Sequence, residues 1–219
     1  MITPQLTTQE HQVLLKFVSP EKIETITRYI ILLLDFNEKK NLISKNTIPI
    51  IWTRHIIDCL QILPFLQKDA NAIVDLGSGS GLPGVLIAIA LPEKRLILVE
   101  KSPVKASFLS LVKDKLGLQN ITIINKAIDK NILYNELQSH LEKMHNITFI
   151  TRAFADLEKL LDIISLVRQK TQTSLVALKG NLVNNELENL SKTHRDQITL
   201  HNSITENGVV LVFTNQNTL

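Results

Sequence analysis

The sequence predicts an α/β fold: a mostly parallel sheet with helices on both faces, preceded by a helical N-terminal extension. From Asn71 onward, short β-branched runs alternate with helical stretches. Parallel strands need crossovers, and these crossovers are usually helical. The first seventy residues, in contrast, contain no glycine and show helical patterning. We therefore divide the chain into an extension, residues 1–70, and an α/β domain, residues 71–219.

The first two helices of the extension have recognisable starts. Thr7 and Glu10 have the spacing of a capping box, which predicts a helix start at this point. Ser19-Pro20 predicts a second start, because Ser caps helices and Pro is tolerated in the first turn. Its apolar residues recur at helical spacing and form one stripe: Ile23, Ile26, Ile30, Leu33 and Leu34.

A third helix is expected to begin near Pro49. Its apolar side holds Trp52, Ile56, Cys59 and Leu63. We interpret Trp52 as a core residue and Cys59 as a buried, inert thiol. Arg54, His55 and Asp58 lie off this stripe, so we expect a polar side that stays free for other work.

The domain shows the alternation in detail. The expected strands are 72–76, 95–100, 121–124, 147–150 and 174–178, and the expected helices are 83–91, 103–116, 129–143 and 156–169. Residues 197–213 indicate two strands around Asn207-Gly208, a turn signal typical of an antiparallel pair, here at a sheet edge.

Composition excludes several classes of protein. The chain has 219 residues, 44% of them hydrophobic, and a net charge of only +3, so a polyanionic partner must meet a local patch. One cysteine excludes an internal disulfide and a Cys-based zinc site, and no His pair has helical metal-binding spacing, so we expect no metal. Residues 1–12 lack the order of a signal peptide, and the apolar stretch 82–92 is too short to cross a bilayer. We expect a cytoplasmic protein without a membrane anchor.

Glycines cluster after the first expected strand. Four of the seven glycines of the chain occupy the eight positions 77–84, just before a helix led by Pro83. Such a turn brings bare backbone close to a ligand at the helix N-terminus. Gly79, Gly81 and Gly84 fit the dinucleotide fingerprint, and Glu100 follows Gly79 by 21 residues, near the spacing of a ribose-binding acid. A nicotinamide dinucleotide and S-adenosylmethionine therefore compete for this site.

Asp75 favours the second cofactor. A carboxylate beside the turn repels a pyrophosphate, whereas S-adenosylmethionine carries an ammonium and a sulfonium. Two like charges about 4 Å apart cost roughly 4 kcal/mol at an effective dielectric constant near 20, and opposite charges gain a similar amount. A dinucleotide fingerprint is also expected to open its domain, while here a helical segment comes first.

Several motifs in one order resemble a known family. They are the glycine stretch 75–84, Thr151-Arg152-Ala153-Phe154-Ala155, Ala177-Leu178-Lys179-Gly180, Arg54-His55-Ile56-Ile57-Asp58 and Asn41-Leu42-Ile43-Ser44. Over residues 36–180 the chain resembles the bacterial small-subunit ribosomal RNA (guanine-N7)-methyltransferases, also called the glucose-inhibited division protein B family. The resemblance implies a class I, Rossmann-like methyltransferase domain with S-adenosylmethionine as donor and S-adenosylhomocysteine as product. It implies a guanine of 16S ribosomal RNA as target.

The resemblance also implies positions for the donor. Gly77 and Leu82 match donor contacts, Glu100 matches the acid for the ribose hydroxyls, and Arg152 matches a donor-site arginine. Ala127-Ile128 fall beside the adenine, but Ile128 replaces a usual Glu. A polar contact there is lost or passes to Asp129, so we expect weaker or rearranged adenine binding and not loss of function. With the glycine stretch, the expected cofactor-binding residues are Asp75, Gly77, Ser78, Gly79, Gly81, Leu82, Glu100, Ala127, Ile128 and Arg152. From about Asn181 no motif matches.

Guanine N7 carries a free lone pair, so no catalytic residue is firmly assigned and positioning is the expected mechanism. Arg152 and Lys179, near strand ends, are the candidates to position the base or its phosphates. In the window 38–55, four cations oppose only Glu38. The resulting charge of +3 equals the net charge of the whole chain. The expected RNA-binding residues are Lys39, Lys40, Lys45, Arg54, His55 and Lys179.

Structural interpretations stay open beside these. The basic stretch is also compatible with a solvated helix face, and His55 with a surface histidine. Asp58 has the i,i+4 spacing to pair with Arg54. Arg152 is compatible with a structural role that only neutralises a strand-end carboxylate such as Asp75.

Two other functional classes stay open as well. One is a methyltransferase for a small molecule or protein, and the other is a donor-binding module without turnover. For the leading interpretation we expect a monomer acting on partly assembled small subunits.

Overall fold

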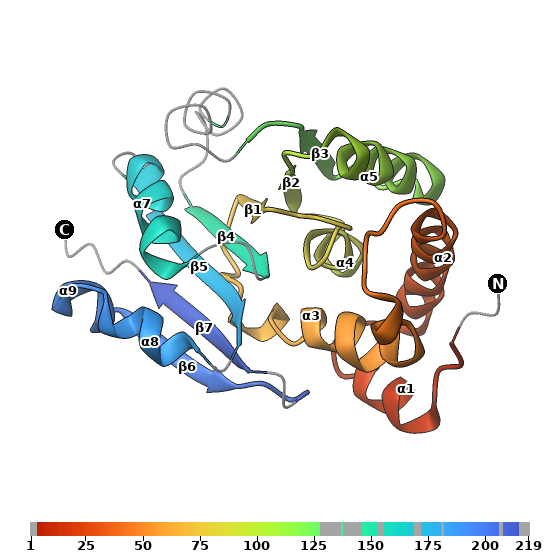
Figure 1. Cartoon of the computed structure of the whole chain (residues 1–219), viewed down its shortest axis with the longest axis horizontal. Helices are drawn as coiled ribbons and strands as arrows, with labels where there is room; N and C mark the ends of the chain where they lie inside the picture. The colour runs from red at the N-terminus through yellow and green to blue at the C-terminus, as the bar shows by residue number, and fades with distance from the viewer. Residues whose placement is uncertain are drawn as a thin grey trace.

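Seven strands form one sheet in the order β3-β2-β1-β4-β5-β7-β6 (Figure 1). The computed structural model describes residues 4–127, 137, 146–152, 156–168, 172–180, 182–205 and 208–214. The strands are β1 (Ala72–Leu76), β2 (Arg95–Val99), β3 (Ile121–Ile124), β4 (Asn146–Arg152), β5 (Gln172–Lys179), β6 (Ile198–Asn202) and β7 (Val209–Thr214). The first five are parallel, whereas β7 runs antiparallel to both β5 and β6. The α/β fold and the antiparallel edge pair are thus confirmed.

The extension is helical, as expected. Its elements are α1 (Thr8–Leu14), α2 (Pro20–Asn37), η1 (Lys45–Ile50), η2 (Trp52–Ile57), α3 (Asp58–Leu60) and η3 (Leu63–Phe65). The capping box at Thr7 and Glu10 is present, and the whole predicted stripe of α2 is buried. Trp52 is buried too, and its indole N–H donates to the carbonyl of Pro4 over 2.8 Å.

One prediction for the third helix was wrong. η2 is a single π-helical turn that continues into α3, and it buries His55 and Asp58 instead of leaving a free polar side. His55 contacts Thr47 of the neighbouring η1, whereas Asp58 contacts Thr205 and Arg152, which are distant in sequence. These partners cover the side of the helix that we expected to face solvent.

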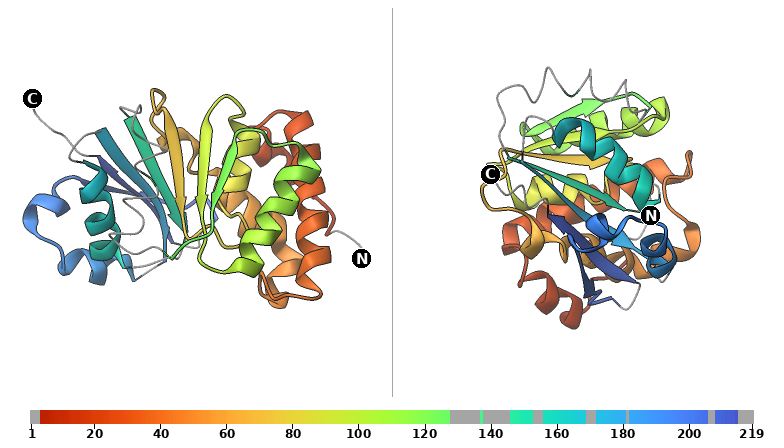
Figure 2. Two further views of the ribbon diagram at one scale, coloured as in Figure 1. Left: turned by 90° about the horizontal axis from the view of Figure 1, so that it is seen from above. Right: turned by 90° about the vertical axis from the view of Figure 1, so that its left-hand side faces the viewer.

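Helices cover both faces of the sheet (Figure 2). They are α4 (Gly84–Ala90), α5 (Pro103–Leu116), α7 (Leu157–Arg168), α8 (Val183–Glu188) and α9 (Lys192–Arg195). On one face, α4, α5 and the extension share a hydrophobic cluster with Ile73 of β1. On the other face, α7 and α8 pack with Val74. Residues alternate between two buried faces, as expected for a covered parallel sheet.

The expected helix 129–143 lies outside the described residues except for Leu137, which is buried. The division of the chain at residue 70 stays a prediction, since the extension and one sheet face share one core cluster.

The sheet has a topological switch point between β1 and β4. From β1 the chain moves outward through β2 to β3, and from β4 it moves outward through β5 in the opposite direction. In open α/β sheets, ligands bind outside the carboxyl ends of the strands at such a point. The residues that follow β1, β2, β4 and β5 therefore define the region in which a site is expected.

Candidate functional site

The glycine loop after β1 is held from several sides. The amides of Gly77 and Ser78 both donate to the carbonyl of Val99 at the end of β2, over 3.0 Å each. The hydroxyl of Tyr29, from α2, donates to the carbonyl of Ser80 over 2.8 Å. The extension thus takes part in shaping this loop.

Two glycines of the loop have different reasons to be glycine. A Cβ on Gly84 would lie 2.4 Å from Leu98 Cδ2 and 2.5 Å from Asp75 Oδ2, so Gly84 allows α4 to pack closely on the sheet. Gly79 has a φ of +57°, and a Cβ there would meet only the carbonyl of Gly77, at 3.8 Å. Its constraint is conformational, and its half-buried backbone leaves room for a ligand.

Glu100, which follows β2, points to this loop. Its Oε2 accepts from the amide of Gly79 and its Oε1 from the amide of Ser102, both over 2.8 Å. An ionised carboxylate has about four acceptor positions. These two bonds therefore leave capacity for the hydroxyls of a ribose, and the loop and the acid together fit the expected donor.

Asp75 has a structural task that the sequence did not indicate. It is fully buried, and its Oδ2 accepts from the amide of Gly84 over 3.0 Å at the start of α4. Burial raises the pKa of Asp75 to about 7. A carboxyl group with this pKa is only partly ionised at neutral pH, so its charge alone does not decide between the two cofactors.

The strand order of the sheet distinguishes between the two expected cofactors better than the charge of Asp75 does. A dinucleotide-binding sheet has the strand order 3-2-1-4-5-6. Here β7 is inserted antiparallel between β5 and β6.

Arg152 ends β4 and reaches into the extension. Its Nη2 donates to the carbonyl of Arg54 over 3.1 Å, its Nη1 to Cys59 Sγ over 3.4 Å, and its Nε lies 3.6 Å from Asp58 Oδ2. The carboxylate that faces Arg152 is thus Asp58 and not Asp75, and the ion-pair partner of Asp58 is Arg152 and not Arg54. The two structural interpretations from the sequence, a pair of Asp58 with Arg54 and a pair of Arg152 with Asp75, were therefore wrong.

Lys179 ends β5 beside Arg152, since the parallel register pairs Arg152 with Leu178. Its side chain is buried, and Nζ forms an ion pair of 2.6 Å with Glu186 of α8. A cavity of about 170 Å³ lies here, which we call the acceptor cavity. Its lining residues are Arg54, Asp58, Arg152, Leu178, Lys179, Gly180, Ser203 and Val209. Three expected cations, Arg54, Arg152 and Lys179, thus line one cavity. The ion pair of Lys179 with Glu186 was not expected from the sequence.

His55 is buried and uncharged. Thr47 Oγ1 donates to the carbonyl of Ser44 and lies 2.8 Å from His55 Nε2, so Thr47 accepts and Nε2 carries the ring proton. Burial, together with the nearby Arg152 and Arg54, lowers the pKa of His55 to about 4. A neutral imidazole cannot contact a phosphate as a cation. A contact of His55 with the RNA stays a prediction, and it would have to use the neutral imidazole.

The other expected residues lie further out or outside the description. Lys39, Lys40 and Lys45 are exposed in the segment from α2 to η1, apart from the acceptor cavity lining. Ala127 is exposed, while Ile128 lies outside the described residues together with Asp129. Burial raises the pKa of Cys59 to about 12, which is consistent with an inert thiol.

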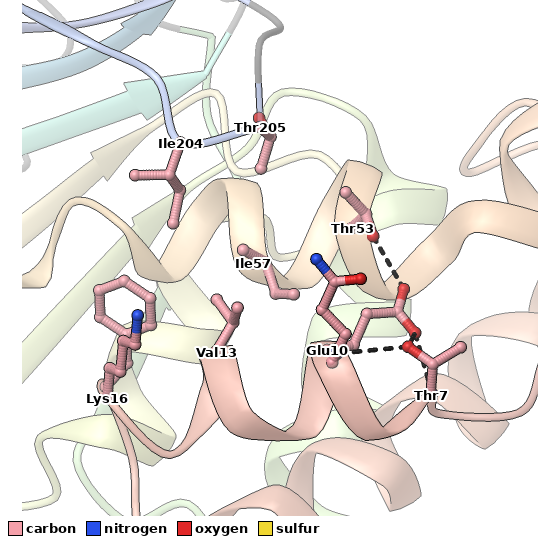
Figure 3. Close-up of a pocket in the computed structure, with 10 residues that line it drawn as sticks. Thr7, Glu10, Val13, Lys16, Thr53, Ile57, Ile204 and Thr205 are labelled. Atoms are coloured by element: carbon pink, nitrogen blue, oxygen red, sulfur yellow. Dashed lines mark hydrogen bonds between the residues drawn. The ribbon is translucent and has the colours of Figure 1, made fainter.

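A further cavity of about 470 Å³ lies between α1, η2 and the turn at 203–205 (Figure 3). Ile57, Val13 and Ile204 line it, and Glu10 is fixed at one end by Thr7 and Thr53. Among the described residues, no group of three or more His, Cys, Asp or Glu side chains is arranged to hold a metal. Within the same part of the chain, no helix is long and apolar enough to span a membrane.

The fold is that of the class I methyltransferases. A crystal structure of a methyltransferase from Geobacter sulfurreducens superposes with a TM-score of 0.55 at 14% identity and covers 97% of this chain and 99% of that one. A crystal structure of an MtNAS mutant in complex with S-adenosylmethionine superposes with a TM-score of 0.50 at 18% identity, covering 88% of this chain and 76% of that one.

The sequence comparisons define the family within this class. The family model GidB, rRNA small subunit methyltransferase G, matches residues 22–211, and the chain belongs to this family. The ribosomal RNA small subunit methyltransferase G of Bartonella henselae is 35% identical over 212 residues, 93% of each chain. That of Bradyrhizobium sp. strain ORS 278 is 36% identical over 194 residues, covering 86% of this chain and 82% of the relative.

Proposed function

We propose that this chain transfers the methyl group of S-adenosylmethionine to N7 of a guanine in 16S ribosomal RNA and releases S-adenosylhomocysteine. The chain belongs to the family of these methyltransferases, and one observation of its structure supports the proposal. The glycine loop with Glu100 and the cation-lined acceptor cavity share the carboxyl edge of one sheet, on the two sides of its switch point.

The donor side works mainly through backbone. The bound donor supplies a methyl group activated by a sulfonium. Residues 77–82 would provide the backbone against which the donor is held, and Glu100 would accept from its ribose hydroxyls. Asp75 holds the start of α4 and keeps the loop in place. Ala127 and Ile128 remain the expected neighbours of the adenine.

The acceptor side needs alignment and not proton transfer. N7 has a lone pair and no proton to lose, so the N7–carbon bond forms while the carbon–sulfur bond breaks, and the positive charge passes to the guanine. Alignment of reacting groups is worth about 7–11 kcal/mol in favourable cases. Because N7 must remain free, Arg152 and Lys179 serve best as donors to O6 and to phosphates.

The RNA must present N7 outside a regular helix. The major groove of A-form RNA is too narrow for side chains, so a loop or distorted region is required. We therefore expect partly assembled small subunits to be better substrates than naked duplex RNA. Assembly of these subunits takes place in the bacterial cytoplasm, where we expect the chain to act as a monomer.

The test is transfer of tritium from labelled S-adenosylmethionine. The purified chain is incubated with small subunits from cells that lack it, and the labelled nucleotide is mapped by nuclease digestion. We expect label at a guanine of the ribosomal RNA. Label only in protein or in small molecules indicates the alternative enzyme, and donor binding without any label indicates a binding module. Efficient labelling of a short regular duplex contradicts the expected substrate form.

The division of labour has its own test. Lys179→Ala should lower RNA methylation while calorimetry shows nearly unchanged binding of S-adenosylhomocysteine. Glu186→Gln is the matched control, since it removes the negative charge that faces Lys179 but keeps the cation. An equal loss of methylation and donor binding in Lys179→Ala contradicts this assignment.

A further inference from the structure

One guanidinium fastens the end of β4 to the extension. Arg152 contacts the carbonyl of Arg54, the carboxylate of Asp58 and the sulfur of Cys59, which all belong to one helical run. The Arg152 and Asp58 side chains are 15% and 7% exposed. Because a guanidinium is a rigid planar fork, it cannot rotate without losing all three contacts.

Asp58 also binds a third segment. Its Oδ1 accepts from the hydroxyl of Thr205 over 2.7 Å and from Gln61 Nε2 over 3.0 Å. Gln61 reinforces the same connection, because its Oε1 accepts from the amide of Ile204 over 2.9 Å. Thr205 and Ile204 form the turn after β6, which lies over η2 (Figure 3). One carboxylate therefore joins the extension, the end of β4 and this turn.

The three joined segments are walls of the acceptor cavity. Arg54 and Asp58 line it from the extension, Arg152 from β4, and Ser203 from the turn. Lys179 and Val209, which are paired in the β5–β7 register, line the rest of this edge. The relative placement of these walls sets the shape of the cavity that a base would enter.

Stability alone is a weak reason for this arrangement. Replacing a buried ion pair by apolar residues of similar volume is often neutral or stabilising, because desolvation offsets the attraction. What a satisfied buried network provides is a fixed geometry. At the carboxyl edge of the sheet, a fixed geometry is what an alignment reaction requires.

We infer that Asp58 is a positioning residue: it holds Arg152 and the turn at 203–205 around the acceptor cavity and thereby orients the target guanine. This inference rests on the proposed function. Asp58 acts through Arg152 and Thr205, while the donor loop depends on other contacts, namely Glu100, Tyr29 and Asp75. Arg152 is also an expected donor-site residue, but its contacts described here lie at the acceptor cavity, so loss of Asp58 should slow methyl transfer far more than it weakens donor binding.

The test compares Asp58→Asn with Asp69→Asn in the full chain. Asp69 accepts from Asn146 at the opposite end of β4, so its replacement is the same chemical change away from the site. With saturating tritiated S-adenosylmethionine and small subunits, we expect Asp58→Asn to lower the maximal rate about 10-fold to 100-fold. The dissociation constant of S-adenosylhomocysteine should stay within about twofold. Asp69→Asn should leave both values unchanged.

Thr205→Val is the second variant, for the case that Asp58→Asn does not fold. It removes the hydroxyl that donates to Asp58 Oδ1 and that also lies 2.9 Å from Ser203 Oγ within the same turn, and we expect a loss of rate of about threefold to tenfold. In the double variant the two losses should combine to less than their product, because both changes break the same bond.

Three outcomes overturn the inference. They are a wild-type rate in folded Asp58→Asn or in Thr205→Val, a donor dissociation constant that rises as much as the rate falls, and an equal loss of rate in Asp69→Asn. If the wild-type chain labels no ribosomal RNA, the proposed function fails as well. If the wild type is active and Asp58→Asn equals it, only the inference fails.

Discussion

The donor loop after β1 is shaped by backbone, whereas the acceptor cavity after β4 and β5 is shaped by charged side chains. The loop depends on glycines and on amide contacts to Val99 and Glu100, within 25 residues of chain. The cavity is lined by residues from the extension, two parallel strands and the end of the chain. The difference is that the loop is held mostly by contacts within one short stretch of chain, with Tyr29 of α2 as a distant addition, whereas the cavity uses contacts that only the complete fold brings together.

The sharpest way to break the donor side is Gly84→Ala. The added methyl would overlap Leu98 and Asp75, so we expect a loss of about 1–3 kcal/mol in the free energy of unfolding. Donor binding should fall at least about 100-fold, because α4 and the loop are displaced together. Chemical denaturation and calorimetry with S-adenosylhomocysteine measure the two effects.

Gly117→Ala is the control for Gly84→Ala. Gly117 has a φ of +67° at the end of α5, and a Cβ there would meet nothing within 4 Å. This change should cost about 1–2 kcal/mol of stability and leave donor binding intact. Equal donor affinity in the two variants would show that the packing of α4 does not support the loop.

The exposed lysines test the RNA side at longer range. Replacing Lys39, Lys40 and Lys45 together by Gln removes three of the expected phosphate contacts. The affinity for small-subunit RNA should fall about 10-fold to 100-fold at low salt. The slope of log affinity against log salt should decrease by about 2. Filter binding at several salt concentrations gives both values.

The matched variant replaces the exposed lysines Lys68, Lys115 and Lys192, which lie outside the 38–55 window. It changes the net charge by the same amount. A similar change of the salt slope in both triple variants means that the window 38–55 is an ordinary solvated surface.

Glu100→Gln tests the single side chain on which the donor side relies. The amide keeps one acceptor oxygen but loses the charge that binds hydroxyls and backbone amides strongly. We expect donor binding to weaken about tenfold, with RNA affinity unchanged. Calorimetry with S-adenosylhomocysteine measures the first quantity and filter binding the second. An unchanged donor affinity would mean that the ribose lies elsewhere.

The effect of His55 leaves activity at neutral pH untouched and is visible only as a loss of stability in acid. Its pKa is lowered from 6.5 to about 4 in the folded state, so the unfolded chain binds more protons between these values. The stability associated with the neutral imidazole of His55 is fully present above pH 6.5. As the pH falls towards 4, the free energy of unfolding decreases by about 1–3 kcal/mol. In His55→Asn, unfolding free energies measured by urea denaturation between pH 4 and 7 should depend less on pH. Equal pH profiles would contradict the buried neutral state.

The sequence predicted the local parts of this structure well. The strand at Ala72–Leu76 and the helix at Pro103–Leu116 have the predicted bounds, because periodicity and caps are written in consecutive residues. The contact of Tyr29 with the loop had a signal that was not used, since Tyr29 lies three residues after Ile26 on the buried stripe of α2.

The acceptor side was predictable only in part. Arg54, Arg152 and Lys179 were singled out from motifs, but their partners were not. Thr205 reaches Asp58 across 147 positions of sequence, and no periodicity or spacing encodes such a contact. The pairing of Lys179 with Glu186 had no usable signal either, because it depends on where α8 packs after β5.

The hydrogen bond from Tyr29 to Ser80 connects the two halves of the reaction. The hydroxyl belongs to the extension that carries the exposed lysines, and the carbonyl belongs to the loop that faces the donor. Because α2 carries this hydroxyl, a displacement of α2 would disturb its hydrogen bond to the loop. Thermodynamic linkage then fixes the outcome: whatever factor the nucleic acid adds to the affinity for the methyl donor, the methyl donor adds to the affinity for the nucleic acid.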